Sequence, residues 1–334
     1  YQSDAFPPRY HDRIFMANIH EQSVLTDVFE PRGSGFVGRH GADFLLANNA
    51  QWVGFSIEIG PAGNVFVLDW HDADICGSDV LNKETGRIFR VAPVQSEAVD
   101  FPERDRDVSK LSDQQLAKLQ LSTSDWHARR ARIVLQHRAA TNTEPKPSID
   151  PSAIASLESI LASDRSAAIR LRALWSLHVT DHLDHERLIA LLTDDQEYVR
   201  GWAIQLLCED GSPADDILAR FAAMAADDPS PVVRLFLASA ISRVGESAKW
   251  AIASGLVSHA EDTDDHNLPK MIWFGMESSV VADPARAIEL ASRSRLPRLT
   301  RYVARRLSDA DRIDELIPAL LQWTGEKSAF PSES

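Results

Sequence analysis

Apolar and polar positions alternate in short runs along the first part of the chain. Runs rich in β-branched and aromatic residues stand between Gly, Pro and Asn residues, at roughly ten-residue spacing. These runs predict six short antiparallel strands, at 13–19, 24–29, 35–39, 53–59, 64–70 and 87–91. The tetrapeptide Gly60–Gly63 predicts a tight turn between the fourth and fifth strands. Residues 1–93 show no helical period, so we expect them to be β.

The pattern changes after residue 93. Residues 94–110 are polar, charged and aperiodic, which predicts a linker, whereas apolar positions recur at helical spacing over 111–325. Ser112 with Gln115 forms a capping-box motif, and Asp150 followed by Pro151 predicts a second helix start. Residues 326–334 form a tail. The sequence therefore predicts an α+β multidomain chain, with an antiparallel β part followed by an all-α part.

One motif repeats in the helical part: an Asp, four residues, then a β-branched residue (Ile or Val) and Arg, so that the Arg lies six positions after the Asp. Its three copies are Asp164–Arg170, Asp194–Arg200 and Asp228–Arg234, and each precedes an apolar helix. The arginines step by 30 and 34 residues, a period typical of helix-pair repeats. The motif resembles that of HEAT repeats, which implies a solenoid of stacked helix pairs. We expect these six residues to be structural, each Arg binding an Asp or a carbonyl of a neighbouring turn, and Trp175 and Trp202 to pack between repeats.

Charge and composition exclude several classes of function. The 334 residues include 35 Lys+Arg and 49 Asp+Glu, a net charge of −14, without a basic cluster to bind nucleic acid. No apolar run approaches the roughly 18 residues of a transmembrane helix. Cys76 and Cys208 are too few for a disulfide scaffold or a four-cysteine metal site. Because the chain begins at Tyr1 rather than Met, we expect a fragment of a longer protein.

Several short motifs carry a resemblance to a known family. They are Gly33–Phe36, Gly60–Gly63, Asp69-Trp70 and Gly86–Phe89, followed by the helical repeats. Together they resemble the putative membrane-bound dehydrogenases of planctomycetes and verrucomicrobia, in which a glucose/sorbosone dehydrogenase-like β-propeller precedes HEAT-like repeats. The resemblance implies that residues 1–93 are about one and a half C-terminal blades, whereas a closed propeller needs at least about four.

The resemblance also implies a function and a location. This chain would be the C-terminal part of a periplasmic or extracytoplasmic quinoprotein-type dehydrogenase of sugars or alcohols, inactive by itself. No cofactor is expected in it, because PQQ with Ca²⁺ and haem c would belong to the rest of the parent protein; this sequence has no Cys-x-x-Cys-His. Its partners would be the other propeller blades and a cytochrome c domain. The alternative is a non-catalytic scaffold that binds a protein partner along the solenoid.

Blade geometry brings loops 20–23, 40–52 and 70–86 to one rim of the propeller. We expect His71 to act there as a general base oriented by Asp72, with Asn48, Trp52, His20 and His40 as substrate contacts. Asn49, Gln51 and Asp74 belong to the same loops. The alternative is that these side chains are ordinary solvated loop positions.

Two segments have the spacing of metal ligands. The loop from Asp72 begins like an EF-hand, but Cys76 and Lys83 replace two of its oxygen ligands, which excludes that motif and leaves a looser contact through Asp72 and Asp74 open. His178, His182 and His185 have a spacing that suits zinc on one helix face. Thr180-Asp181 and Asp184, however, predict a helix end, a turn and the next N-cap, which favours separate exposed positions.

Overall fold

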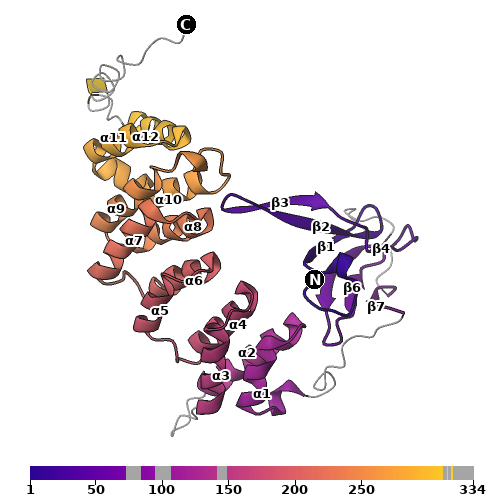
Figure 1. The fold of residues 1–334 in the computed structure, drawn as a ribbon. Coiled ribbons are helices and arrows are strands. Elements are labelled where there is room, and N and C mark those ends of the chain that lie inside the picture. The colour runs from indigo at the N-terminus through magenta and orange to yellow at the C-terminus, as the bar shows by residue number, and fades with distance from the viewer. Residues whose placement is uncertain (73–83, 95–106, 141–148, 311–313, 315–316, 319–334) are drawn as a thin grey trace. The chain divides into compact units, whose positions relative to one another are not determined.

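The structure is a computed structural model that describes residues 1–72, 84–94, 107–140, 149–310, 314, 317 and 318. The described part is α+β, with two small antiparallel sheets and twelve α-helices (Figure 1). The chain divides into two compact units. The first comprises Tyr1–Glu30 and Val37–Leu183, and the second comprises Pro31–Phe36 and Asp184–Ser334.

The β part holds one sheet of four strands and one of three. In the first sheet β2 lies between β1 and β3, and the two-residue β4 pairs with the start of β2. In the second sheet β6 lies between β5 and β7. The strands are β1 (Arg13–Asn18), β2 (Ser23–Arg32), β3 (Gly35–His40), β4 (Leu45–Leu46), β5 (Gly54–Ile59), β6 (Val65–Asp69) and β7 (Arg87–Val91). All six predicted strands are confirmed, and β4 was not predicted.

The β part buries an aromatic and aliphatic core. Along β6, Val65, Val67 and Asp69 are buried while the side chains between them are half-buried, as expected for a strand with one face on a core. The core comprises Tyr1, Ala5, Phe6, Tyr10, Val24, Trp52, Val65 and Val67, with half-buried Phe15 and Phe44 packed against it. Phe15 and Phe44 lie 4.6 Å apart between ring centroids.

Four α-helices complete the first unit. They are α1 (Asp113–Lys118), α2 (Asp125–Ala140), α3 (Pro151–Leu161) and α4 (Ala167–Val179). Helix α4 packs on α3 and on α2, and α1 packs on α3. Both predicted helix starts are confirmed. Ser112 and Gln115 form a reciprocal capping box at α1. At α3 the N-cap residue Asp150 precedes Pro151, and its carboxylate accepts the backbone N–H of Ser152.

Of the eight α-helices that the structure describes in the second unit, seven form two layers (Figure 1), and α5 packs on α6. In one layer α6 packs on α8, α8 on α10 and α10 on α12; in the other, α7 packs on α9 and α9 on α11. Their bounds are α5 (His185–Leu191), α6 (Glu197–Leu207), α7 (Asp215–Asp227), α8 (Pro231–Ala240), α9 (Glu246–Leu256), α10 (Leu268–Ala282), α11 (Pro284–Arg293) and α12 (Pro297–Asp309).

Consecutive helices pack as pairs, from α1 with α2 to α11 with α12. The described residues hold six such pairs. Short 3₁₀ helices stand at Pro8–Tyr10, Val108–Lys110, Leu119–Leu121, Ile241–Arg243 and Ala260–Asp262. None of the helices in the described ranges has the length and apolar character needed to cross a membrane.

Candidate functional site

A buried carboxylate organises the corner where β6 ends. One oxygen of Asp69 accepts the backbone N–H of Val53 at 2.7 Å and that of His71 at 3.0 Å. The other oxygen accepts the Arg87 Nε–H at 2.8 Å and pairs with the positive charge of the same guanidinium, whose Nη2 lies 2.6 Å away. Asp69 thereby joins the end of β6 to the residue before β5 and to the first residue of β7. Charge-assisted bonds of this kind fix the geometry of the corner.

His71 occupies a strained position in this corner. Its φ of 56° lies in the left-handed region, which non-glycine residues seldom adopt. The side chain is half-buried, and its Nδ1 is buried without a hydrogen-bond partner among the described residues. The next residue, Asp72, is 4% exposed. A strained imidazole beside a buried carboxylate in the sequence is an arrangement found at proton-transfer sites.

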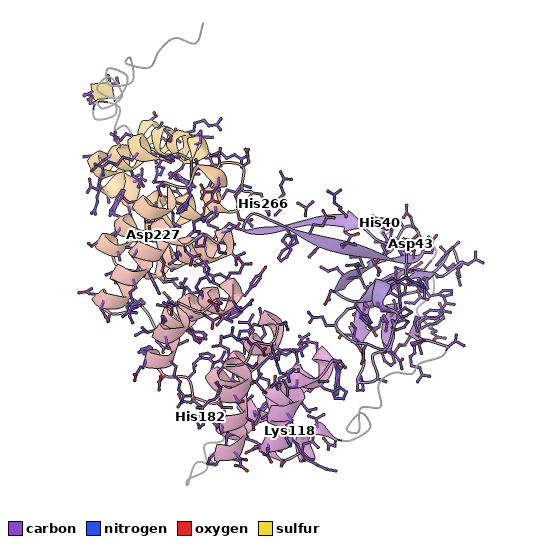
Figure 2. All side chains as sticks on the ribbon, viewed as in Figure 1. His40, Asp43, Lys118, His182, Asp227 and His266 are labelled. Carbon is purple, nitrogen blue, oxygen red and sulfur yellow. The ribbon has the colours of Figure 1, made fainter. Side chains whose placement is uncertain are left out.

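The other predicted rim residues lie in varied surroundings. His20 is exposed in a turn, and Asn48 is exposed with a φ of 49°. His40 lies 3.1 Å from the Asp43 carboxylate (Figure 2). The Asp27 carboxylate lies 3.6 Å from its other ring nitrogen.

Trp52, in contrast, is 1% exposed and belongs to the core of the β part, where its contacts are those of packing. Within the described residues no hydrogen bond or ion pair joins His71 to His20, His40 or Asn48. Asp74 and the rest of the predicted calcium-like loop lie outside the described residues.

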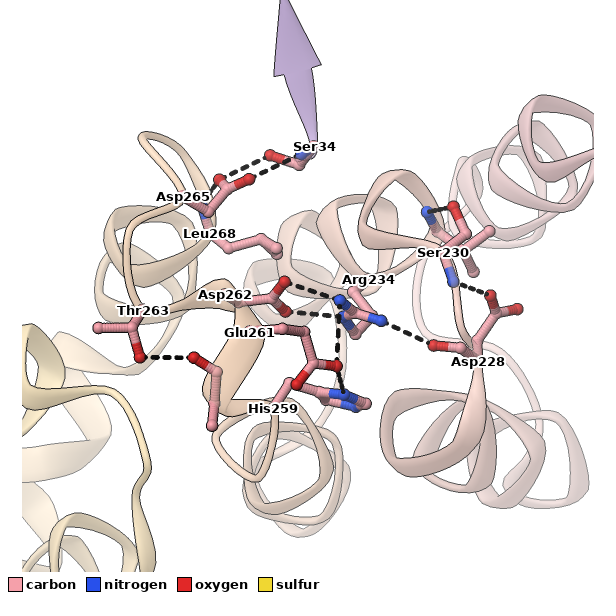
Figure 3. Close-up of polar contacts among 12 residues, drawn as sticks. Ser34, Asp228, Ser230, Arg234, His259, Glu261, Asp262, Thr263, Asp265 and Leu268 are labelled. Carbon is pink, nitrogen blue, oxygen red and sulfur yellow. Dashed lines mark hydrogen bonds and ion pairs between the residues drawn. The ribbon is translucent and has the colours of Figure 1, made fainter. Parts of the chain in front are cut away.

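The repeat motif forms a recurring clamp in the second unit. Arg200 binds both carboxylate oxygens of Asp228, each at 2.9 Å, and donates to the Asp194 carbonyl at 2.7 Å. Arg234 binds both oxygens of Asp262, each at 2.7 Å, and donates to the Asp228 carbonyl at 2.9 Å (Figure 3). In both cases the carboxylate lies 28 residues after the Arg and the carbonyl 6 residues before it.

The first copy of the motif lies in the other unit, where its Arg also binds a backbone carbonyl. Arg170 donates from Nε to the Leu161 carbonyl at 2.7 Å, and Asp164 is exposed. Trp175 and Trp202 are half-buried rather than fully buried. The Arg132 guanidinium of α2 lies 5.2 Å from the Trp175 ring, and Phe236 of α8 lies 6.4 Å from Trp202. Each Trp therefore faces a helix of an adjacent pair.

The turn that holds Ser34, between β2 and β3, is bound to the start of α10; both belong to the second unit. The Asp265 carboxylate accepts the backbone N–H of Ser34 at 2.7 Å and its hydroxyl at 2.8 Å (Figure 3). It also accepts the backbone N–H groups of Asn267 and Leu268, each at 2.8 Å. Burial raises the pKa of the Asp265 carboxyl, but the hydrogen bonds from Ser34, Leu268 and Asn267 outweigh it, so that this pKa is lowered.

The three spaced histidines do not share one helix. Helix α4 ends at Val179, Asp181 adopts a φ of 63°, and the Asp184 carboxylate caps α5, so the predicted helix end, turn and N-cap are confirmed. Across the described ranges no group of three or more His, Cys, Asp or Glu side chains is arranged to hold a metal ion.

Sequence reasoning missed Asp69 with Arg87, Asp262, and Ser34 with Asp265. A signal for Asp262 was present, because Asp194, Asp228 and Asp262 follow one another at intervals of 34 residues. Asp262 does not complete the motif, because Leu268 stands six residues later where the motif has Arg. The Ser34–Asp265 contact spans 231 residues and carries no local signal.

Comparison with known proteins gives no family assignment: no protein-family model matches the chain, and no curated protein matches it.

Proposed function

We propose that this chain is a protein-interaction scaffold, a HEAT-like solenoid joined to the end of a β-propeller. The observation that carries the proposal is the clamp made by Arg200 and again by Arg234, with equal spacings to the carboxylate and to the carbonyl. When the same contact recurs at the interval of the sequence repeat, the repeats form similar structural units that stack on one another.

The packing of the helices supports the same proposal. Helices α6, α8, α10 and α12 follow one another in one layer, so that the same side of each helix pair faces the same direction along the stack. Solenoids use such repeated faces to bind extended partners. By the family resemblance, the partner is the c-type cytochrome domain of a parent dehydrogenase-like protein.

Binding of a separately purified c-type cytochrome domain to this chain tests the scaffold function. Sedimentation velocity, followed at the haem absorbance, should show the haem domain moving with the chain in a saturable complex. A myoglobin sample of matched concentration serves as the control haem protein. Independent sedimentation of the cytochrome domain across the concentration range would contradict the proposal.

A second candidate function rests on the His71 corner. In a parent sugar or alcohol dehydrogenase, His71 would accept the hydroxyl proton of the substrate, with Asp72 orienting the imidazole. The strained φ and the unpartnered Nδ1 in the described part of the chain favour this role.

His71→Ala in the full-length protein tests that role. With a dye acceptor and a panel of sugars, loss of a general base should lower turnover by about 10²–10⁴-fold. His185→Ala, which removes an exposed imidazole at the start of α5, is the matched control. Wild-type turnover of His71→Ala would remove His71 from the mechanism and leave the scaffold function standing.

A further inference from the structure

The sheet of β5, β6 and β7 has a second face that points away from the core of the β part. Along β6 every second residue from Val65 to Asp69 is buried. Phe66 and Leu68, together with Trp70 directly after the strand, therefore lie on the opposite face. We call this face the outer face of the second sheet.

Strand pairing extends the outer face across all three strands. Leu68 pairs with Ser56 of β5 and with Ile88 of β7, and residues paired directly across antiparallel strands share a face. Phe55 joins the same face at the register shift of β5, because its ring lies edge-to-face with that of Trp70 at 6.1 Å between centroids.

The apolar side chains of the outer face are exposed to solvent. Ile88 is 72% exposed, Phe55 55% and Trp70 51%, and the half-buried Leu68 lies between them on β6. Soluble monomers rarely expose contiguous apolar patches, and such patches mark interaction sites. Aromatic side chains such as Trp and Phe are also enriched at the centre of protein interfaces. The outer face therefore has the composition of a docking surface.

Two opposite charges flank the outer face at the same level. Glu58 of β5 and Arg90 of β7 both pair with Phe66, one on each side of it. Neighbouring strands lie about 4.8 Å apart, so the two backbones are about 10 Å apart. Both side chains are exposed, and neither makes an ion pair within the described residues. A face with one charge of each sign on either side of an apolar centre is complementary to a rotated copy of itself.

A two-fold axis parallel to β6 makes this complementarity exact in register. Rotation about that axis lays β5 of one copy over β7 of the other, level by level. Glu58 then faces Arg90 of the second copy, and the same pair recurs on the other flank. A two-fold axis across the strands would instead set Glu58 against Phe55 and leave its charge unpaired. Charge therefore selects the axis along β6.

The described helices offer no alternative cover for the outer face. Their large apolar side chains with comparable exposure stand singly, as Ile133 of α2 and Phe274 of α10 do, or lie beyond α12, as Ile317 does. A helix needs an apolar stripe, repeated at helical spacing, to cover a sheet. A second copy of the outer face, in contrast, supplies both the apolar surface and the opposite charges.

We propose that the outer face joins two copies of this chain into a dimer, with their β5–β6–β7 sheets packed face to face about a two-fold axis along β6. Sheets that pack in this way lie about 10 Å apart with nearly aligned strands. Three strands form a small interface, so the dimer should dissociate on dilution. This surface belongs to the first unit and is independent of the helical layers on which the scaffold function rests.

Sedimentation velocity over a dilution series of the chain tests the proposal. The wild type should show a monomer–dimer equilibrium, and Ile88→Asp should weaken dimerisation by about tenfold or more, because it buries an unpaired charge. The matched control is Leu46→Asp, which makes the same kind of change at a side chain 73% exposed on β4 of the first sheet. That variant should dimerise like the wild type.

Charge reversal tests the two-fold arrangement itself. Glu58→Arg alone and Arg90→Glu alone each set like charges opposite one another on both flanks, so each should weaken dimerisation by about tenfold or more. An equimolar mixture of the two variants restores opposite charges on both flanks and should form a heterodimer with nearly wild-type affinity. Wild-type far-ultraviolet circular dichroism of each variant confirms that it is folded.

Three results would overturn the proposal. A wild-type chain that stays monomeric at its highest soluble concentration would leave the outer face to a different partner. A dimer lost equally in Leu46→Asp and Ile88→Asp would not depend on this sheet. A mixture of Glu58→Arg and Arg90→Glu that associates no better than either variant would exclude the axis along β6.

Discussion

Arg234 shows how a single buried charge holds two helix pairs of the second unit. Its side chain is 2% exposed and that of its partner Asp262 is 5% exposed, so neither charge is solvated. Removing only the guanidinium leaves a buried carboxylate without its counter-ion, and that loss exceeds the worth of the pair itself.

Arg234→Met should therefore lower the free energy of unfolding by about 3–5 kcal/mol. Arg234→Met combined with Asp262→Leu should recover much of this loss, because no unpaired charge remains. Urea unfolding of both variants measures the difference. A double variant no more stable than Arg234→Met would show that the packing of Arg234, and not its charge, holds the structure.

Arg200 makes the same clamp one repeat earlier, with a more exposed side chain. Arg200→Ala should lower the melting temperature, because it leaves the Asp228 carboxylate without its guanidinium partner. Scanning calorimetry of the variant and the wild type measures this change. An unchanged melting temperature would contradict a structural role.

Asp265 links stability to pH. Its carboxylate accepts four hydrogen bonds, and its pKa in the folded chain is lowered below the unfolded value near 3.8. The stabilisation is therefore present above about pH 4 and lost as the pH falls through the folded pKa. Asp265→Asn should be less stable than the wild type at neutral pH, and the two stabilities should converge in acid. If the stability difference between Asp265→Asn and the wild type is equally large in acid, the charge of Asp265 is not its cause.

At the scale of elements, close helix packing depends on glycine. A Cβ on Gly255 of α9 would lie 2.8 Å from the Ala225 backbone carbon of α7, closer than the two helices allow. Gly245, at the start of the same helix, has no atom within 4 Å of that position. The two glycines therefore form a matched pair for substitution.

Gly255→Ala should destabilise the chain by about 1–3 kcal/mol, because the added methyl group forces α7 and α9 apart. Gly245→Ser should leave stability unchanged or raise it slightly, since Ser is a preferred N-cap residue. Chemical denaturation of the two variants gives the comparison. Equal stabilities would mean that α7 and α9 can separate without loss.

Local sequence patterns predicted most helices and strands, but they did not predict contacts between residues that are far apart in the sequence. The strands, the capping box at Ser112 and the cap at Asp184 follow from neighbouring residues, so their signals are local. The residues before Trp52 have the pattern of a loop, which led to the prediction of a substrate contact. Its burial depends on the strands that form the core of the β part. The Ser34–Asp265 contact needs residues 231 positions apart, and the left-handed φ of His71 occurs beside a hydrogen bond to Asp69 that no local pattern predicts.

For the second unit as a whole, the repeat predicts that one complete period can be removed. Deletion of residues 201–234 joins Arg200 to Leu235 and leaves 62 − 34 = 28 residues between Arg200 and Asp262, the same spacing as in the native Arg234 clamp. Units of a solenoid contact only their neighbours, so the shortened chain should still fold cooperatively, with a smaller helical circular dichroism signal. Deletion of residues 211–227 removes α7 alone and leaves α8 without its pair, so that chain should unfold at a much lower temperature. If the in-register deletion melts as early as the removal of α7, the helices of this unit do not form interchangeable repeats, and the solenoid proposal fails with it.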